Sequence, residues 1–314
     1  MRESRGRSSE MSLRLCSRAP RMMSWSATNV PFLIGGRACR DPSNKCSPWY
    51  GGRTSRHTVH HDLTGRRQRP FRGRLRRRGG VGHDGRVTLP VAAATDRLLH
   101  TVDHLPDDDW AADSGCTGWS RAHVIAHVAL NAEGLGGAVR GLLDGVPTLM
   151  YASNERRDAD IATLAAAPPA QVRDRLRTSA AMLDAALADL PTLPDDATFE
   201  RTPGGVRLSA HVVPLLRLRE VEIHHADLLA GYTHADWPTE TAVRFLEQDA
   251  GRYDGTPVVA RATDVGRTFA FGSADVDSPV VTGSASALAW WATGRDPGGL
   301  LTSSTGTLPR MEGR

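Results

Sequence analysis

Lysine is almost absent from this chain of 314 residues, because Lys45 is the only lysine among 39 basic residues. The basic residues are also unevenly distributed. Residues 1–85 carry 19 Arg and Lys against five Asp and Glu, a net charge of +14, whereas the remainder carries 20 against 30, a net charge of −10. The isoelectric point of about 9.2 therefore describes the N-terminal segment, and we do not infer a nucleic-acid partner from it.

Cysteine is scarce as well. Three of the four cysteines lie within residues 1–85, and only Cys116 follows, so the rest of the chain has no disulfide framework and suits a reducing compartment. No apolar run approaches the roughly 18 residues that a membrane span needs. The basic start, Met1–Arg5, is followed by neither the apolar stretch nor the cleavage site of a secretory signal. We expect a cytoplasmic protein with no membrane contact.

Sustained periodicity is missing from residues 1–85, which are rich in Arg, Ser and Gly. Such a segment cannot bury enough apolar surface to offset its ordering entropy, so we expect a disordered extension. Because no lysine occurs beyond it, the chain resembles the product of a high-GC genome, where a mis-set start codon adds an Arg-rich stretch. The alternatives are a genuine disordered tail and a basic arm. The cluster His57–Asp62 is not expected to bind a metal.

Helical patterns begin after Val87. Four long helices are predicted, over residues 90–105, 120–139, 169–190 and 208–230, with a short helix or ordered loop over 154–165. Ser120 is placed to cap the second helix, and Pro168 and Pro169 introduce the alanine-rich third. In the fourth, Pro214 lies in or near the first turns and Gly231 is expected to end the helix.

The pattern changes after Trp237 and Pro238. A helix over 239–250 is followed by β-rich runs near 257–263, 267–272 and 279–282, and by a last helix over about 284–294. We therefore expect a mainly α fold in three parts. These are the disordered extension (1–85), a four-helix bundle (88–234) and a small α/β C-terminal domain (235–314).

A polar stripe marks the fourth helix. Residues three, four and seven apart share a helix face, so Arg217, Glu220, His224 and Asp227 lie together. A carboxylate and an imidazole one turn apart can both reach a single ion. Glu222 with either His225 or Asp227 offers competing choices on the same helix, so spacing alone leaves the pair open.

The second helix offers a possible third ligand. His127 interrupts an otherwise apolar helix, although His123, four residues earlier, is an alternative. Three His or Glu ligands plus an open position are what a catalytic zinc ion uses. Two ligands from one helix and a third from a facing helix suit the interior of a bundle. We therefore predict that these two helices hold one metal ion between them.

Four motifs occur in a familiar order and spacing. They are Gly118–Arg121 continuing to His127–Ala132, Tyr151–Ile161, Leu218–Leu228 and Trp290–Arg295. Together they resemble the mycothiol-dependent maleylpyruvate isomerase family, whose bundle belongs to the wider DinB-like metal-binding group. The resemblance covers about residues 88–310 and does not include residues 1–85.

This resemblance implies a set of site residues. Zinc would be held by His127, Glu220 and His224, with water in the fourth position. Arg295 would bind the carboxylates of the substrate, assisted by Arg157 and Asn131 as contacts to substrate and thiol cofactor. In the alternative, Arg295 is only the neighbour of a helix C-cap at Gly294. Asp227 would accept a hydrogen bond from a ligating imidazole.

The resemblance also implies a reaction. The substrate would be a cis ene-diacid such as maleylpyruvate, and the cosubstrate would be mycothiol, whose thiolate adds to the double bond, allows rotation and is expelled. The chain is expected to be monomeric, and Cys116 is not expected to be a nucleophile. The alternatives are a mycothiol S-transferase acting on electrophiles and a non-catalytic metal-binding stress or regulatory protein. Arg295 favours the isomerase, since neither alternative needs it.

Overall fold

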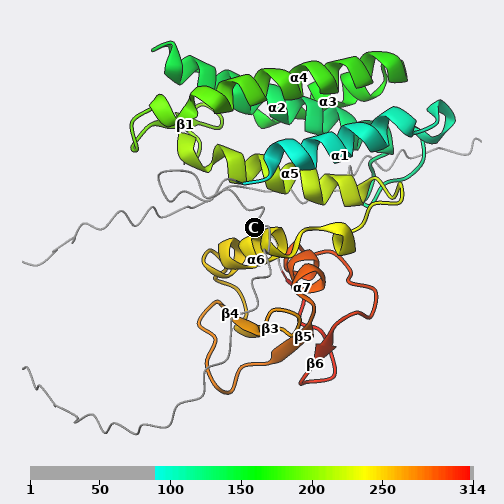
Figure 1. Cartoon of the computed structure of the whole chain (residues 1–314), viewed down its shortest axis with the longest axis vertical. Coiled ribbons are helices and arrows are strands. Elements are labelled where there is room, and N and C mark those ends of the chain that lie inside the picture. The colour runs from blue at the N-terminus through cyan, green and yellow to red at the C-terminus, as the bar shows by residue number, and fades with distance from the viewer. Residues whose placement is uncertain (1–88, 312–314) are drawn as a thin grey trace, which may run out of the picture. The chain divides into compact units, whose positions relative to one another are not determined.

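The computed structural model describes residues 89–311 (Figure 1), so the predictions made for residues 1–85 lie outside the described residues. Within the described part, the predicted mainly α fold is confirmed. The bundle consists of α1 (Val91–His104), α2 (Arg121–Leu143), α4 (Pro169–Asp189) and α5 (Val213–Asp227), with α3 (Asn154–Ala165) packed on α2. Helix α2 packs against both α4 and α5, and α1 packs against α5 and α4.

Local chemistry explains where these helices begin. The hydroxyl of Ser120 accepts a hydrogen bond from the backbone N–H of His123 and caps α2, as predicted. Ser153 caps α3 in the same way, which decides the open choice at 154–165 in favour of a helix. Helix α4 begins at Pro169, where the missing N–H costs nothing. Helix α2 runs past the predicted end to Leu143 and is followed by Gly145, whose φ is +70°.

The predicted fourth helix is shorter at both ends than 208–230. Residues 207–209 are strand β2 (Arg207–Ser209), paired antiparallel with β1 (Thr198–Glu200), and neither strand was predicted. A 3-10 turn then leads into α5, because Pro214 tolerates only the first turn of an α-helix. At the other end the helix stops at Asp227. Leu229, with a φ of +52°, breaks the helix before Gly231 is reached.

The C-terminal part combines two helices with a small sheet. Helix α6 (Thr239–Ala250) precedes β3 (Val258–Ala262), β4 (Arg267–Phe271) and β5 (Val280–Gly283), and α7 (Ala285–Ala292) precedes β6 (Thr302–Ser303). The strand order is β4-β3-β5-β6, in which only the β3–β5 pair is parallel. Helices α6 and α7 pack on each other and on the strands. The predicted helices and the first three β runs are thus present, whereas β6 was not predicted.

One hydrophobic core includes residues of both parts. It contains Leu98 of α1, Leu218 of α5, Phe245 of α6, Val281 of β5 and Trp291 of α7. Trp237 also donates its indole N–H to the carbonyl oxygen of Glu222. The boundary predicted near residue 235 therefore stays a prediction. Among the described helices, none has the length and apolarity that crossing a bilayer requires.

A buried polar network joins α1 to α5. Buried Glu222 accepts hydrogen bonds from Arg97 of α1 and from the hydroxyl of Tyr232. Next to it, the ring of His225 stacks on Tyr232 with 3.7 Å between ring centroids, and its Nε2 lies 2.8 Å from the hydroxyl of Thr101. Glu222 and His225, which were competing metal ligands, thus have structural partners in the fold.

His225 should make the fold sensitive to acid. Burial lowers the pKa of its imidazole to about 4, and Arg97 acts in the same direction. Since the unfolded imidazole titrates near 6.5, the unfolded state binds more protons between these values, and stability rises with pH across this window. Going from pH 7.5 to pH 5 should reduce the free energy of unfolding by about 2 kcal/mol through this residue alone.

The measurement is urea unfolding at both pH values for the wild type and for His225→Gln, which cannot titrate. The difference between the two pH values should be smaller in the variant by about that amount. Equal pH dependence in both proteins would show that another group is responsible.

Candidate active site

The predicted metal ligands meet at the interface of α2 and α5. His127 Nε2 lies 2.9 Å from Glu220 Oε2, and His224 Nε2 lies 3.4 Å from the same oxygen. One donor atom from each of the three residues falls within 4.8 Å of the others. The two imidazole rings meet edge to face, with 4.7 Å between centroids. Glu220 keeps 27% of its side chain exposed, so the triad of His127, Glu220 and His224 can be reached from solvent.

The pKa values of all three triad residues are strongly shifted. Burial alone would raise the pKa of Glu220, but His127 and His224 hold it well below its usual range. Burial lowers the pKa of His127 to about 4, although Glu220 opposes this. Burial would also lower the pKa of His224, but its hydrogen bonds to Asp227, Cys116 and Glu220 raise it well above the normal value. At neutral pH the free triad therefore contains a carboxylate, a neutral His127 and a protonated His224.

Arg157 of α3 determines which nitrogen of His127 carries the proton. Its Nη2 lies 3.2 Å from His127 Nδ1, and a guanidinium can only donate. Nδ1 must therefore accept, and the proton sits on Nε2, from which it is donated to Glu220. Arg157, predicted as a contact to the thiol cofactor, thus lies directly beside the triad and also pairs with Asp158.

The competing ligand His123 lies outside the triad. Its Nδ1 is 2.8 Å from the hydroxyl of Ser120, and its ring stacks on Trp119 with 6.2 Å between centroids. Trp119 also lies 5.6 Å from the ring of His127 and was not predicted to be near the ligands. Of the two histidines of α2, therefore, only His127 is brought to Glu220 and His224.

Asp227 links the triad to the C-terminal part. Its buried carboxylate accepts a hydrogen bond from His224 Nδ1 at 2.9 Å, which is the contact expected of a group that orients a ligating imidazole. Arg295 donates to the same carboxylate from Nε at 2.8 Å and from Nη2 at 2.6 Å. Gly115 also approaches it, since a Cβ at that position would meet Asp227 Oδ1 at 3.0 Å. The guanidinium predicted to bind substrate is thus already paired.

Cys116 is a second unpredicted neighbour. Its Sγ lies 3.3 Å from Asp227 Oδ2 and 3.9 Å from His224 Nδ1. Cys116, His224 and Asp227 therefore form another group of potential ligands that shares His224 with the triad. The sequence could not predict this contact, because Cys116 lies in the loop before α2, far along the chain from His224 and Asp227.

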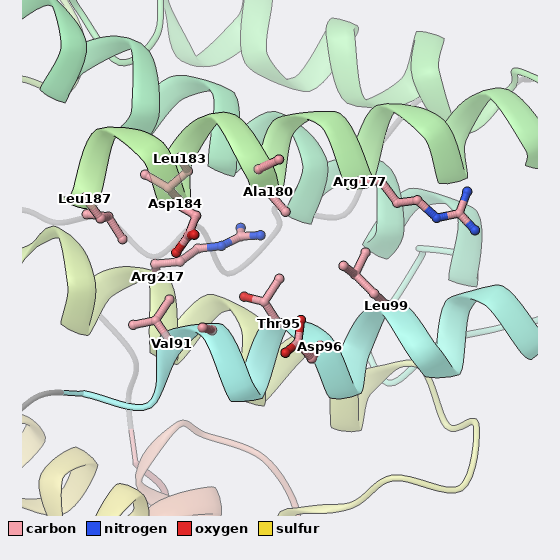
Figure 2. Close-up of a pocket in the computed structure, with 12 residues that line it drawn as sticks. Val91, Thr95, Asp96, Leu99, Arg177, Ala180, Leu183, Asp184, Leu187 and Arg217 are labelled. Carbon is pink, nitrogen blue, oxygen red and sulfur yellow. The ribbon is translucent and has the colours of Figure 1, made fainter. Parts of the chain in front are cut away.

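Asn131 is buried and hydrogen-bonded to Arg217, which lines a cavity. A cavity of about 200 Å³ lies between α1 and α4, and Figure 2 shows the guanidinium of Arg217 there, between Thr95 and Ala180. Arg217 Nη1 donates to the carbonyl oxygen of Val128 at 2.8 Å and to Asn131 Oδ1 at 3.1 Å. Asn131 is only 3% exposed and faces Arg217, so its contact with a thiol cofactor stays a prediction.

Comparisons with known proteins find both a matching family model and similar solved structures. Residues 91–229 match the family model described as the mycothiol maleylpyruvate isomerase N-terminal domain. Two solved structures, of the mycothiol-dependent maleylpyruvate isomerase and of a histidine-to-alanine mutant of it, are each 27% identical to this chain, with a TM-score of 0.63. Each match covers 70% of this chain and 92% of the other. The search of curated proteins gave no match.

The matched residues contain the whole triad and Asp227, and the solved structures extend the likeness over most of the described chain. Residues 91–229 therefore belong to the mycothiol maleylpyruvate isomerase N-terminal domain family, and the chain as a whole is similar to the mycothiol-dependent maleylpyruvate isomerase, as its sequence motifs predicted.

Proposed function

We propose that this chain is a metal-dependent, mycothiol-dependent cis–trans isomerase of an ene-diacid such as maleylpyruvate. The observation that carries this proposal is the triad itself, because His127, Glu220 and His224 converge within 4.8 Å in a domain of this family. Two imidazole nitrogens and one carboxylate oxygen are a donor set used by catalytic zinc, with one position left open. The residues present thus fit a divalent ion.

An ion bound there would supply positive charge and Lewis acidity, which favour a thiolate over a thiol and stabilise a developing enolate. The surrounding residues prepare the ligands. Asp227 accepts from His224 Nδ1 and so directs Nε2 of this ring towards Glu220. Arg295 keeps Asp227 ionised, because its guanidinium and His224 hold the pKa of this carboxyl far below the usual range even though burial opposes the shift.

Arg157 would lose its contact with His127 if His127 held an ion through Nε2. The neutral imidazole would then carry its proton on Nδ1, so Arg157 could no longer donate a hydrogen bond to that atom. The guanidinium would be available for an anion. In the proposed reaction the thiolate adds to the cis double bond, the resulting single bond rotates, and expulsion of the thiol leaves the trans isomer. The substrate carboxylates and the enolate charge need cationic partners throughout.

The test is an assay of the purified full chain with maleylpyruvate, with and without mycothiol, before and after chelation. We expect the trans isomer to form only when metal and thiol are both present, while the concentration of free thiol stays constant. Consumption of one thiol per turnover would instead identify an S-transferase. Metal binding without turnover of either kind would identify a binding protein.

A further inference from the structure

Two arginines converge on one aromatic ring beside the triad. The guanidinium carbons of Arg157 and Arg201 lie 5.7 Å and 5.2 Å from the centroid of the Tyr151 ring. Arg157 belongs to α3 and reaches His127, whereas Arg201 follows strand β1 in the hairpin. The backbone N–H of Tyr151 donates to the carbonyl oxygen of Arg201, which fixes the ring beside the hairpin. All three side chains keep some exposure to solvent.

The positive charge of this pair is incompletely compensated. Arg157 is paired with Asp158, but Arg201 donates to the neutral side-chain oxygen of Asn154 at 2.6 Å. Among residues 89–311, no carboxylate lies within ion-pair distance of Arg201. Burial lowers the pKa of Arg201 and Arg157 lowers it further, while Tyr151 and the more distant carboxylates of Glu220 and Asp158 act in the opposite direction. Two like charges held this close favour the binding of an anion, and guanidinium groups match the geometry of a carboxylate.

Arg295 differs in this respect. Both of its contacts go to Asp227, at 2.8 Å and 2.6 Å, so its charge is balanced before any substrate binds. The cation best placed to attract a carboxylate to the triad is therefore Arg201, which lies near α3 in the β1–β2 hairpin. On that side of the site the sequence predicted only Arg157.

We propose that Arg201, supported by Tyr151 and Arg157, binds a carboxylate of the substrate and selects for acidic substrates over neutral electrophiles. The proposal rests on the proposed function for the reaction concerned, but carboxylate binding itself requires no turnover. Arg201 would act as a substrate-binding residue that sets specificity, since the bonds that change would lie at the triad.

The test is calorimetric titration of the zinc-loaded full chain with succinate, a saturated diacid that cannot isomerise, and with neutral succinamide. The wild type should bind succinate more tightly than succinamide. Arg201→Met, which keeps the length of the side chain, should weaken succinate binding at least about tenfold and leave succinamide unaffected. Arg207→Met is the matched control, because Arg207 lies in the same hairpin but pairs with Glu200.

Kinetics then separate this role from a purely structural one. With maleylpyruvate, Arg201→Met should raise KM about tenfold with kcat within about twofold, and Arg201→Lys should recover part of the loss. Unchanged succinate binding in Arg201→Met, or its loss in Arg295→Met alone, would overturn the proposal. If succinate binds as expected but no isomerisation is found, the carboxylate site stands and the proposed function fails.

Discussion

Replacing Glu220 with alanine should abolish binding of the proposed divalent ion and, with it, the proposed isomerase activity. The Oε2 atom of Glu220 is the point on which both imidazole nitrogens converge, at 2.9 Å and 3.4 Å. Its loss takes away one of three ligands, so metal affinity should fall by more than the roughly 10- to 100-fold typical of residues that only support ligands. Elemental analysis should find about one equivalent of zinc in the wild type and almost none in the variant.

A matched control is Glu247→Ala, which removes a glutamate from the surface of α6 and should leave the zinc content unchanged. The nearby group of Cys116, His224 and Asp227 provides the contrary outcome. If Glu220→Ala retained its zinc while Cys116→Ser lost it, the ion would be bound at that second group, and the assignment of the metal site to the triad would be wrong.

Replacing Asp227 with alanine should cost the fold about 3 kcal/mol or more in the free energy of unfolding. The carboxylate is fully buried and accepts hydrogen bonds from both Arg295 and His224. Its removal leaves a guanidinium and an imidazolium facing each other without an acid between them, which is the unfavourable way to break a buried ion pair. Denaturant unfolding of the metal-free protein measures the loss directly.

Two further variants isolate the pair. Asp158→Ala removes an acid whose side chain is half exposed and paired with Arg157, so its effect should stay below about 1 kcal/mol. The double variant of Asp227→Ala with Arg295→Met should lose less stability than the two single variants added together, because the stranded charge is gone. Strict additivity would mean that the pair contributes nothing specific to stability.

Much of the fold follows from local sequence chemistry. The cap at Ser120, the prolines that introduce α4 and the proline early in α5 are short-range signals, and each acts where predicted or nearby. The cap at Ser153 is a signal of the same kind, although it was not predicted. The short strands β1, β2 and β6 were missed because two or three residues cannot show a period. The end of α5 was misplaced because Gly231 is the conventional stop, whereas Leu229 already has a positive φ two residues earlier.

The site could be predicted only in part. Spacing of three and four residues along α5 indicated that Glu220, His224 and Asp227 share a face, and family resemblance selected His127 over His123. Spacing could not pair Arg295 with Asp227, since the two are separated by 68 positions. It also could not bring Arg201 or Cys116 to the site, because loop and hairpin positions depend on tertiary packing.

The bidentate contact between Asp227 and Arg295 constrains how relatives of this protein can recombine. The family model ends at residue 229, so it includes the acid but excludes its guanidinium partner. A natural or engineered chimera that joined this bundle to a foreign C-terminal segment would contain Asp227 without the guanidinium that balances its charge. This acid is hydrogen-bonded to His224, a predicted zinc ligand. We therefore expect the bundle and the C-terminal segment that carries Arg295 to be inherited together, even in relatives whose C-terminal sequences differ.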